Sequence, residues 1–85
     1  MSRIELDKVL RRLLNNGETT ISSKRLAIQT FPHIRNHQNG PGVPTGREIA
    51  ICGRYLMEIY KVGWKGYRVK EVPGKYVTLR FENET

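Results

Sequence analysis

The chain has 85 residues, 38% of them hydrophobic, which leaves room for one domain and one core. Fifteen Lys and Arg against eight Asp and Glu give a formal charge of +7, which disfavours basic partners and favours nucleic acid, an anionic membrane surface or an acidic protein. The single cysteine, the charged first residues and the lack of a long apolar run argue against an internal disulfide, secretion and membrane spanning, so we expect a cytoplasmic protein.

The first predicted element is an amphipathic helix at residues 4–15. Leucine and valine recur there at the i, i+3, i+4, i+7 and i+8 spacing of one helical stripe, from Leu6 to Leu14. Acidic residues in the first turn and arginines near the end suit the helix dipole, and Gly17 can terminate the helix. A short strand or an extended bridge is expected next, at residues 18–22, because this stretch is brief and rich in β-branched residues.

The second predicted helix spans residues 24–31. Ser22 or Ser23 can cap it, and it must end before Pro32, because the residue before a proline avoids helical geometry. Residues 32–44 then form a predicted loop that is dense in glycine and proline.

This predicted loop is long for a compact domain, and it contains polar side chains that can bind phosphates or bases. Arg35 is the candidate contact within it, beside His33 and His37. A surface loop without a binding role is the alternative reading.

The third predicted helix, at residues 45–61, has the strongest start signal. Thr45 and Glu48 have the spacing of a capping box, in which the hydroxyl and the carboxylate each accept from the other residue's backbone amide. At 100° per residue, the predicted inward stripe contains Ile49, Cys52, Gly53, Leu56, Ile59 and Tyr60. The predicted outward face carries Arg47, Ile51, Arg54 and Glu58, flanked by Ala50, Tyr55 and Lys61.

The last predicted element is a hairpin at residues 65–81, with Trp64 anchoring it to the helices. Its strands, at 67–72 and 75–81, alternate at period two about Pro73-Gly74, which suits a type II turn. The predicted buried face contains Val69, Val77, Leu79 and Phe81. The predicted exposed face contains Arg68, Lys70, Thr78 and Arg80, with Lys75 at the tip.

The order of these elements resembles the winged helix-turn-helix family over residues 4–81, an α+β fold. The stretch Thr-Gly-Arg-Glu-Ile-Ala, followed by a helix that ends before Gly-Trp and by a basic hairpin, looks like small DNA-binding domains of prokaryotic regulators and mobile elements. The resemblance implies that residues 45–61 are the recognition helix, that 24–31 support it, and that the hairpin is the wing. The sequence departs from the family in joining these two helices by more than a dozen residues instead of a short turn.

We therefore expect a duplex DNA-binding protein, acting as a transcriptional regulator or as an accessory factor in replication or recombination. Arginines on the first turns of a helix in the major groove can reach base edges, and hairpin cations can contact phosphates. Ile51 can meet a thymine methyl group or pack against the loop or a second subunit. The candidate DNA-binding residues are Thr45, Arg47, Ala50, Ile51, Arg54, Lys65, Arg68, Lys70, Lys75 and Arg35.

Two alternatives remain open, an RNA-binding winged helix and a protein-interaction adaptor. Residues 47–80 hold eight Lys and Arg against three acidic residues, which favours a nucleic acid over a protein partner. A homodimer is also left open.

We expect neither an enzyme nor a cofactor. His33 and His37 have the i, i+4 spacing of a metal pair, but they lie in a loop without further ligands, so no metal site is predicted. Cys52 is predicted to face inwards as an inert thiol.

Overall fold

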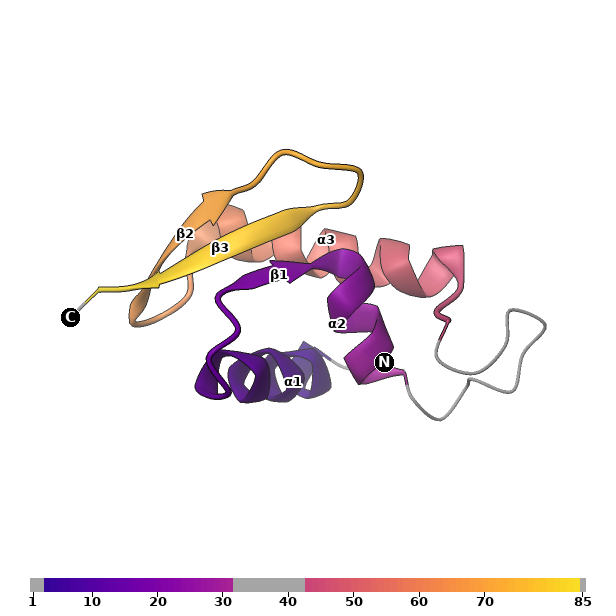
Figure 1. The fold of residues 1–85 in the computed structure, drawn as a ribbon, viewed down its shortest axis with the longest axis horizontal. Coiled ribbons are helices and arrows are strands. Elements are labelled where there is room, and N and C mark those ends of the chain that lie inside the picture. Colours follow the sequence, from indigo (N-terminus) through magenta and orange to yellow (C-terminus); the bar gives the residue numbers. More distant parts are fainter. Residues whose placement is uncertain (1–2, 32–42, 85) are drawn as a thin grey trace.

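The computed structural model describes residues 3–31 and 43–84. In chain order these residues form α1 (Arg3–Asn15), β1 (Thr20–Ser22), α2 (Ser23–Thr30), α3 (Gly46–Val62), β2 (Tyr67–Glu71) and β3 (Thr78–Asn83) (Figure 1). The described part is thus a small α+β fold with three helices and one antiparallel three-stranded sheet. The sequence predicts the three helices, the short strand and the hairpin, but not the pairing of the short strand with the hairpin. Most of the predicted loop at 32–44 lies outside the described residues.

The three helices begin and end close to their predicted limits, because their signals are local. The leucine stripe of α1 is buried, and Gly17 follows the helix with a φ of 92°, a conformation that favours glycine. Ser22 is the N-cap of α2, so the first of the two predicted capping serines is correct. At α3, Thr45 and Glu48 form the predicted capping box.

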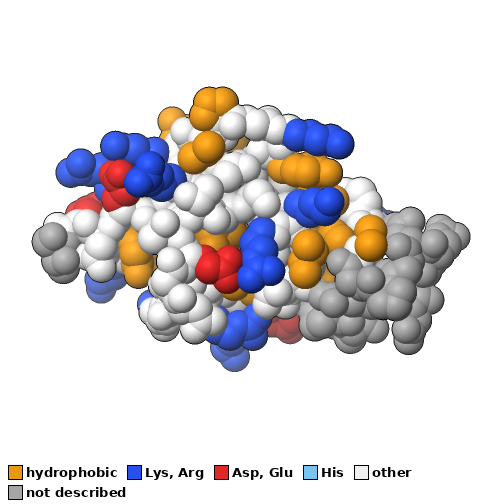
Figure 2. Space-filling model, viewed as in Figure 1, with side chains coloured by type: hydrophobic (Ala, Val, Ile, Leu, Met, Phe, Trp, Pro, Cys, Tyr) orange, Lys and Arg blue, Asp and Glu red, His pale blue; other side chains and the backbone are white. Residues whose placement is uncertain are grey.

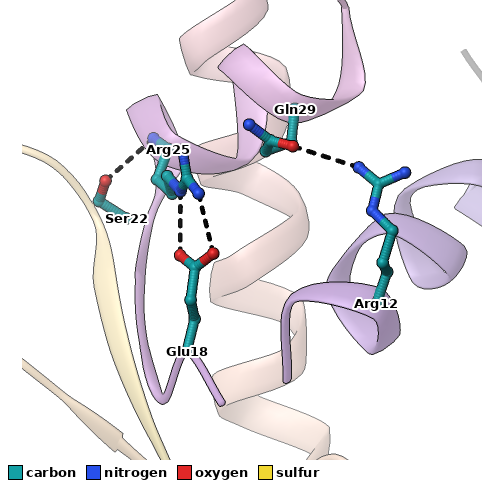
Figure 3. A network of polar contacts seen from close by, with 5 residues as sticks. All are labelled: Arg12, Glu18, Ser22, Arg25 and Gln29. Atoms are coloured by element: carbon teal, nitrogen blue, oxygen red, sulfur yellow. Dashed lines mark hydrogen bonds and ion pairs between the residues drawn. The ribbon is translucent and has the colours of Figure 1, made fainter. Parts of the chain in front are cut away.

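A polar network joins α1, β1 and α2 (Figure 3). Arg25 on α2 donates through Nε and Nη2 to the two carboxylate oxygens of Glu18, at 3.0 and 2.8 Å. This fork geometry lowers the pKa of Glu18, since the hydrogen bonds from the guanidinium favour the charged carboxylate. Arg12 of α1 donates to Gln29 of α2 at 3.3 Å. Two arginines of this basic chain therefore serve contacts within the fold.

Strand β3 is the centre of the sheet, and the strand order is β1-β3-β2. Ile21 pairs with Leu79, and Val69 pairs with Phe81, so these side chains share the face that packs on the helices. The burial predicted for the hairpin is confirmed, because Leu79 and Phe81 are buried and Val69 and Val77 pack partly against the core. The opposite face of the sheet carries Arg68, Lys70, Thr78 and Arg80.

The tight turn predicted at Pro73-Gly74 is wrong. The strands end at Glu71 and resume at Thr78, and residues 72–77 form a longer loop, which we call the wing loop. The backbone amide of Ser23 donates to the Val77 carbonyl at 2.8 Å. This contact continues the β1–β3 register, in which Ser22 pairs with Thr78.

The predicted faces of α3 also need correction. Tyr60 was expected inside but is 43% exposed, whereas Tyr55 was expected on the flank and is only 4% exposed. The reason is that α1 crosses α3 beside Tyr55, whose hydroxyl donates to the Asp7 carboxylate. Ile51 is not bare, as the sequence suggested, but partly buried against the same core.

Candidate functional site

The capping box fixes where the outward face of α3 begins. The Glu48 amide donates to Thr45 Oγ1 at 3.2 Å, and the Thr45 amide donates to Glu48 Oε1 at 2.7 Å. Both side chains are engaged with the helix terminus, so the role of Thr45 in the structure is to start α3. The two residues that follow Thr45, the second of them Arg47, lie in the first turn of α3 and are exposed.

Basic and small side chains share this outward face, which we call the helix face. Its members are Arg47, Ala50, Arg54, Glu58 and Lys61, all exposed, and Glu58 is paired with Arg3 of α1. At 100° per residue they lie within one narrow sector of the helix, opposite the buried stripe. Within the described residues, none of these three cations has an ion-pair partner. The helix face therefore presents positive charge that the fold itself does not use.

A groove of about 600 Å³ runs between α3 and the wing loop, and we call it the helix–loop groove. Its apolar lining is formed by Ile49, Ala50, Gly53, Met57, Tyr76 and Val77. Arg54 and Lys61 of α3 and Lys75 of the wing loop supply three cations around it, and Glu58 supplies one carboxylate. The groove thus has an apolar lining and a net positive charge.

Glycine at position 53 allows the wing loop to come this close to α3. A Cβ atom at Gly53 would lie 3.5 Å from Val77 Cγ2, which is ordinary contact, so a larger side chain would meet the loop. The hydrogen bond from Ser23 to Val77 holds the loop in place from the α2 side.

An aromatic ring joins the wing loop to α2. Lys24 Nζ lies 5.9 Å from the centre of the Tyr76 ring, and Lys75 Nζ lies 5.6 Å from it. Three residues of this region, Lys24, Tyr76 and Lys61, are not among the candidate DNA-binding residues, although Lys61 flanks the predicted outward face of the helix. Lys61 follows Arg54 by seven residues on the same helix face, and this spacing is a signal that could have found it. For Lys24 and Tyr76 no local signal exists, because they lie far apart in the chain.

The structure does not bring all the predicted hairpin cations together. Lys75 lies at the groove, whereas Lys65 lies in the turn before β2, at the other end of the hairpin. Lys70 and Arg80 lie on the outer sheet face, with nitrogens 3.3 and 3.9 Å from the Glu82 carboxylate, and Arg68 pairs with Glu82 in the strand register. Figure 2 shows Lys and Arg side chains gathered around acidic atoms at this end of the sheet.

Cys52 has no access to solvent. It is completely buried in α3, and desolvation together with the Glu48 charge raises the pKa of its thiol to about 12. The inward position predicted for this residue is confirmed.

Two other kinds of feature, a metal site and a membrane-spanning helix, are absent from the described residues. No group of three or more His, Cys, Asp or Glu in residues 3–31 and 43–84 is placed to hold a metal ion. No helix in these ranges is long and apolar enough to cross a membrane. Arg35, His33 and His37 lie outside the described residues.

Neither a protein-family model, nor a curated protein, nor a solved structure matches this chain. The interpretation of the site therefore rests on its own residues. Arginine and lysine side chains around an apolar groove suit an extended polyanion, because guanidinium and ammonium groups donate to phosphate oxygens while apolar side chains contact sugars and bases.

Proposed function

We propose that this chain is a winged helix-turn-helix protein that binds duplex DNA, with α3 as the recognition helix in the major groove and the β2–β3 hairpin as the wing. The observation that carries the proposal is the helix–loop groove, where exposed cations of α3 and of the wing loop lie around one surface. Arg54, Lys61 and Lys75 around the groove favour a polyanion, because contacts between cations and phosphates supply much of the affinity for a nucleic acid.

The order of elements supports the assignment of the fold. A helix, a short strand, two helices and a hairpin follow one another, and β1 pairs with the last strand to give the order β1-β3-β2. Helix α2 packs on α3, as the supporting helix of such a fold would. An α-helix fits the major groove of B-DNA, and α3 is the described helix that offers a free basic face beside the hairpin.

The helix face suggests a division of labour among its residues. Arg47 and Arg54 are two turns apart, about 10 Å along the helix, so both can enter one major groove and reach base edges. Ala50 lies between them and allows close approach to a base or a thymine methyl group. Lys75 on the wing loop contacts a backbone phosphate, which adds affinity without sequence information. Such a protein would act as a transcriptional regulator or as an accessory factor in replication or recombination.

A binding assay on selected DNA tests the proposal. A preferred duplex is first selected from a random library, and its affinity is compared with those of random duplex, single-stranded DNA and structured RNA at two salt concentrations. We expect R54A and R47A to lose about 1–3 kcal/mol on the preferred duplex and less on random duplex, because bidentate contacts to bases are lost.

The matched control is K8A, which removes one exposed cation from α1, away from the helix–loop groove. K8A should lower the affinities for the preferred duplex and for random duplex only as much as the loss of any one positive charge would. Circular dichroism checks that each variant is folded. Tighter binding to RNA or to single strands than to duplex would contradict the proposal. An affinity that does not change with salt would instead favour a protein partner.

A further inference from the structure

The Tyr76 ring lies close to two cations. The ring comes from the wing loop and is only partly buried, and the ammonium groups of Lys24 and Lys75 lie 5.9 and 5.6 Å from its centre. Lys24 belongs to the first turn of α2, so the ring joins the start of one helix to the tip of the hairpin. Two like charges gather here although they repel each other.

The backbone on both sides of this ring is fixed. The Thr78 hydroxyl donates to the Tyr76 carbonyl at 3.0 Å, and the Ser23 amide donates to the Val77 carbonyl at 2.8 Å. Val77 also packs on α3 at Gly53. The ring is therefore mounted on an anchored segment, and the flexible partners are the two lysine side chains.

A lysine side chain loses rotamer freedom when it binds a phosphate, and this entropy cost weakens the contact. A ring face attracts an ammonium group and restricts where it can go before any ligand arrives. We propose that Tyr76 is a positioning residue that holds Lys24 and Lys75 together as one phosphate-binding unit at the edge of the helix–loop groove. This inference rests on the proposed function, because it assigns the unit to the DNA backbone.

Charge and position favour a nucleic-acid backbone as the ligand. Lys75 also lines the helix–loop groove, so the lysine pair continues the row of cations that Arg54 and Lys61 begin on α3. A chain of phosphates can contact such a row, whereas a single small anion would reach only one end of it. The unit thereby connects α2 to a surface that α3 and the wing loop form.

The test compares two substitutions of the same residue. Y76F keeps the ring, and Y76L removes it while keeping an apolar side chain. In NMR spectra of the free protein, the ε-methylene protons of Lys24 and Lys75 should be shifted upfield in the parent and in Y76F, but not in Y76L. On random duplex DNA, Y76L should bind about 3- to 10-fold more weakly than the parent, and Y76F should bind as the parent does.

The matched control is Y60L, the same change at an exposed tyrosine of α3 that does not line the groove. It should leave the lysine signals and the affinity unchanged. The double variant K24A/K75A should reduce the magnitude of the salt slope by about 1.8, since each lost phosphate contact contributes about 0.9. In that background Y76L should weaken binding no further.

A failure of this inference can be distinguished from a failure of the proposed function. If the parent binds duplex and Y76L binds equally well, the inference is wrong and the proposed function stands. If the parent binds no duplex at either salt concentration, both are wrong. Should Y76L fail to fold, the NMR spectrum of the parent still gives the answer, because a lysine held at the ring face must show the upfield shift in the parent itself. Unshifted ε-methylene signals of Lys24 and Lys75 in the parent would overturn the inference.

Discussion

At the scale of single residues, Gly53 carries a helix-propensity cost that its contact with the wing loop does not require. Glycine inside a helix is about 0.5–1 kcal/mol less favourable than alanine. The space at Gly53 admits a Cβ atom at 3.5 Å from Val77 Cγ2, so a methyl group fits without moving the loop. We therefore expect G53A to raise the free energy of unfolding by about 0.5–1 kcal/mol and the melting temperature by about 2–8 °C.

Thermal and urea denaturation measure this effect, and G53V is the informative comparison. Its additional methyl groups must displace Val77, so we expect G53V to be less stable than G53A and to bind DNA more weakly than the parent. A destabilised G53A would show that the loop packs on α3 more tightly than the structure indicates.

At the scale of elements, α1 is attached to α3 by polar contacts at the edge of the core. Tyr55 donates to the Asp7 carboxylate, and Arg3 forms an ion pair with Glu58 at 2.7 Å. The Arg3 guanidinium also lies 5.9 Å from the centre of the Tyr55 ring. Arg3 and Glu58 are both more than half exposed, so solvent screens their ion pair and the buried tyrosine carries the larger effect.

Removing the Tyr55 hydroxyl gives a prediction that depends on pH. Burial and then the Asp7 hydrogen bond raise the pKa of Tyr55 above its ordinary value. A raised pKa in the folded state stabilises the fold below the unfolded pKa, near 10, and this stabilisation is lost as the pH rises above it. We expect Y55F to lose about 1–3 kcal/mol at pH 7, and this deficit to shrink between pH 10 and 11.5.

Urea denaturation of Y55F and the parent across this pH range checks the prediction, with Y60F as the control at an exposed tyrosine. A deficit that stays constant up to pH 11.5 would show that Tyr55 and Asp7 are not coupled in the folded protein.

These elements also show what a sequence can and cannot predict. The limits of α1 and α3 follow from signals within a few residues, namely the leucine stripe and the capping box, and both are confirmed. The burial of Tyr55 and the exposure of Tyr60 could not be predicted, because they depend on where α1 crosses α3. The six-residue wing loop could not be predicted either, because its contacts join residues far apart in the sequence, such as Ser23 and Val77.

At the scale of the whole molecule, the net charge of +7 is divided among surfaces with different roles. Arg3 and Arg12 connect α1 to α3 and α2, and Arg25 connects α2 to Glu18 in the segment before β1. A second set lies at the helix–loop groove, and a third set shares Glu82 on the outer sheet face. The sequence located Arg54, which lines the groove, but alternation along a strand could not tell which hairpin cations lie beside α3.

This division gives a prediction that compares two lysines of the hairpin. Lys75 lies at the helix–loop groove, whereas Lys70 faces away from the helices and is 3.3 Å from the Glu82 carboxylate. A duplex bound on the helix face would contact Lys75 but not Lys70. Log affinity falls with log salt with a slope of about 0.9 per phosphate neutralised, so K75A should reduce the magnitude of that slope by about 0.9, and K70A should leave it unchanged.

The two variants remove the same charge from the same hairpin, so the general effect of net charge cancels between them. The measurement is a salt titration of the affinity for random duplex DNA, with circular dichroism to confirm that both variants are folded. Equal reductions of the slope would mean that the DNA also contacts the outer sheet face. A reduction for K70A alone would place the duplex on the sheet rather than on α3, and would leave the helix–loop groove to another ligand.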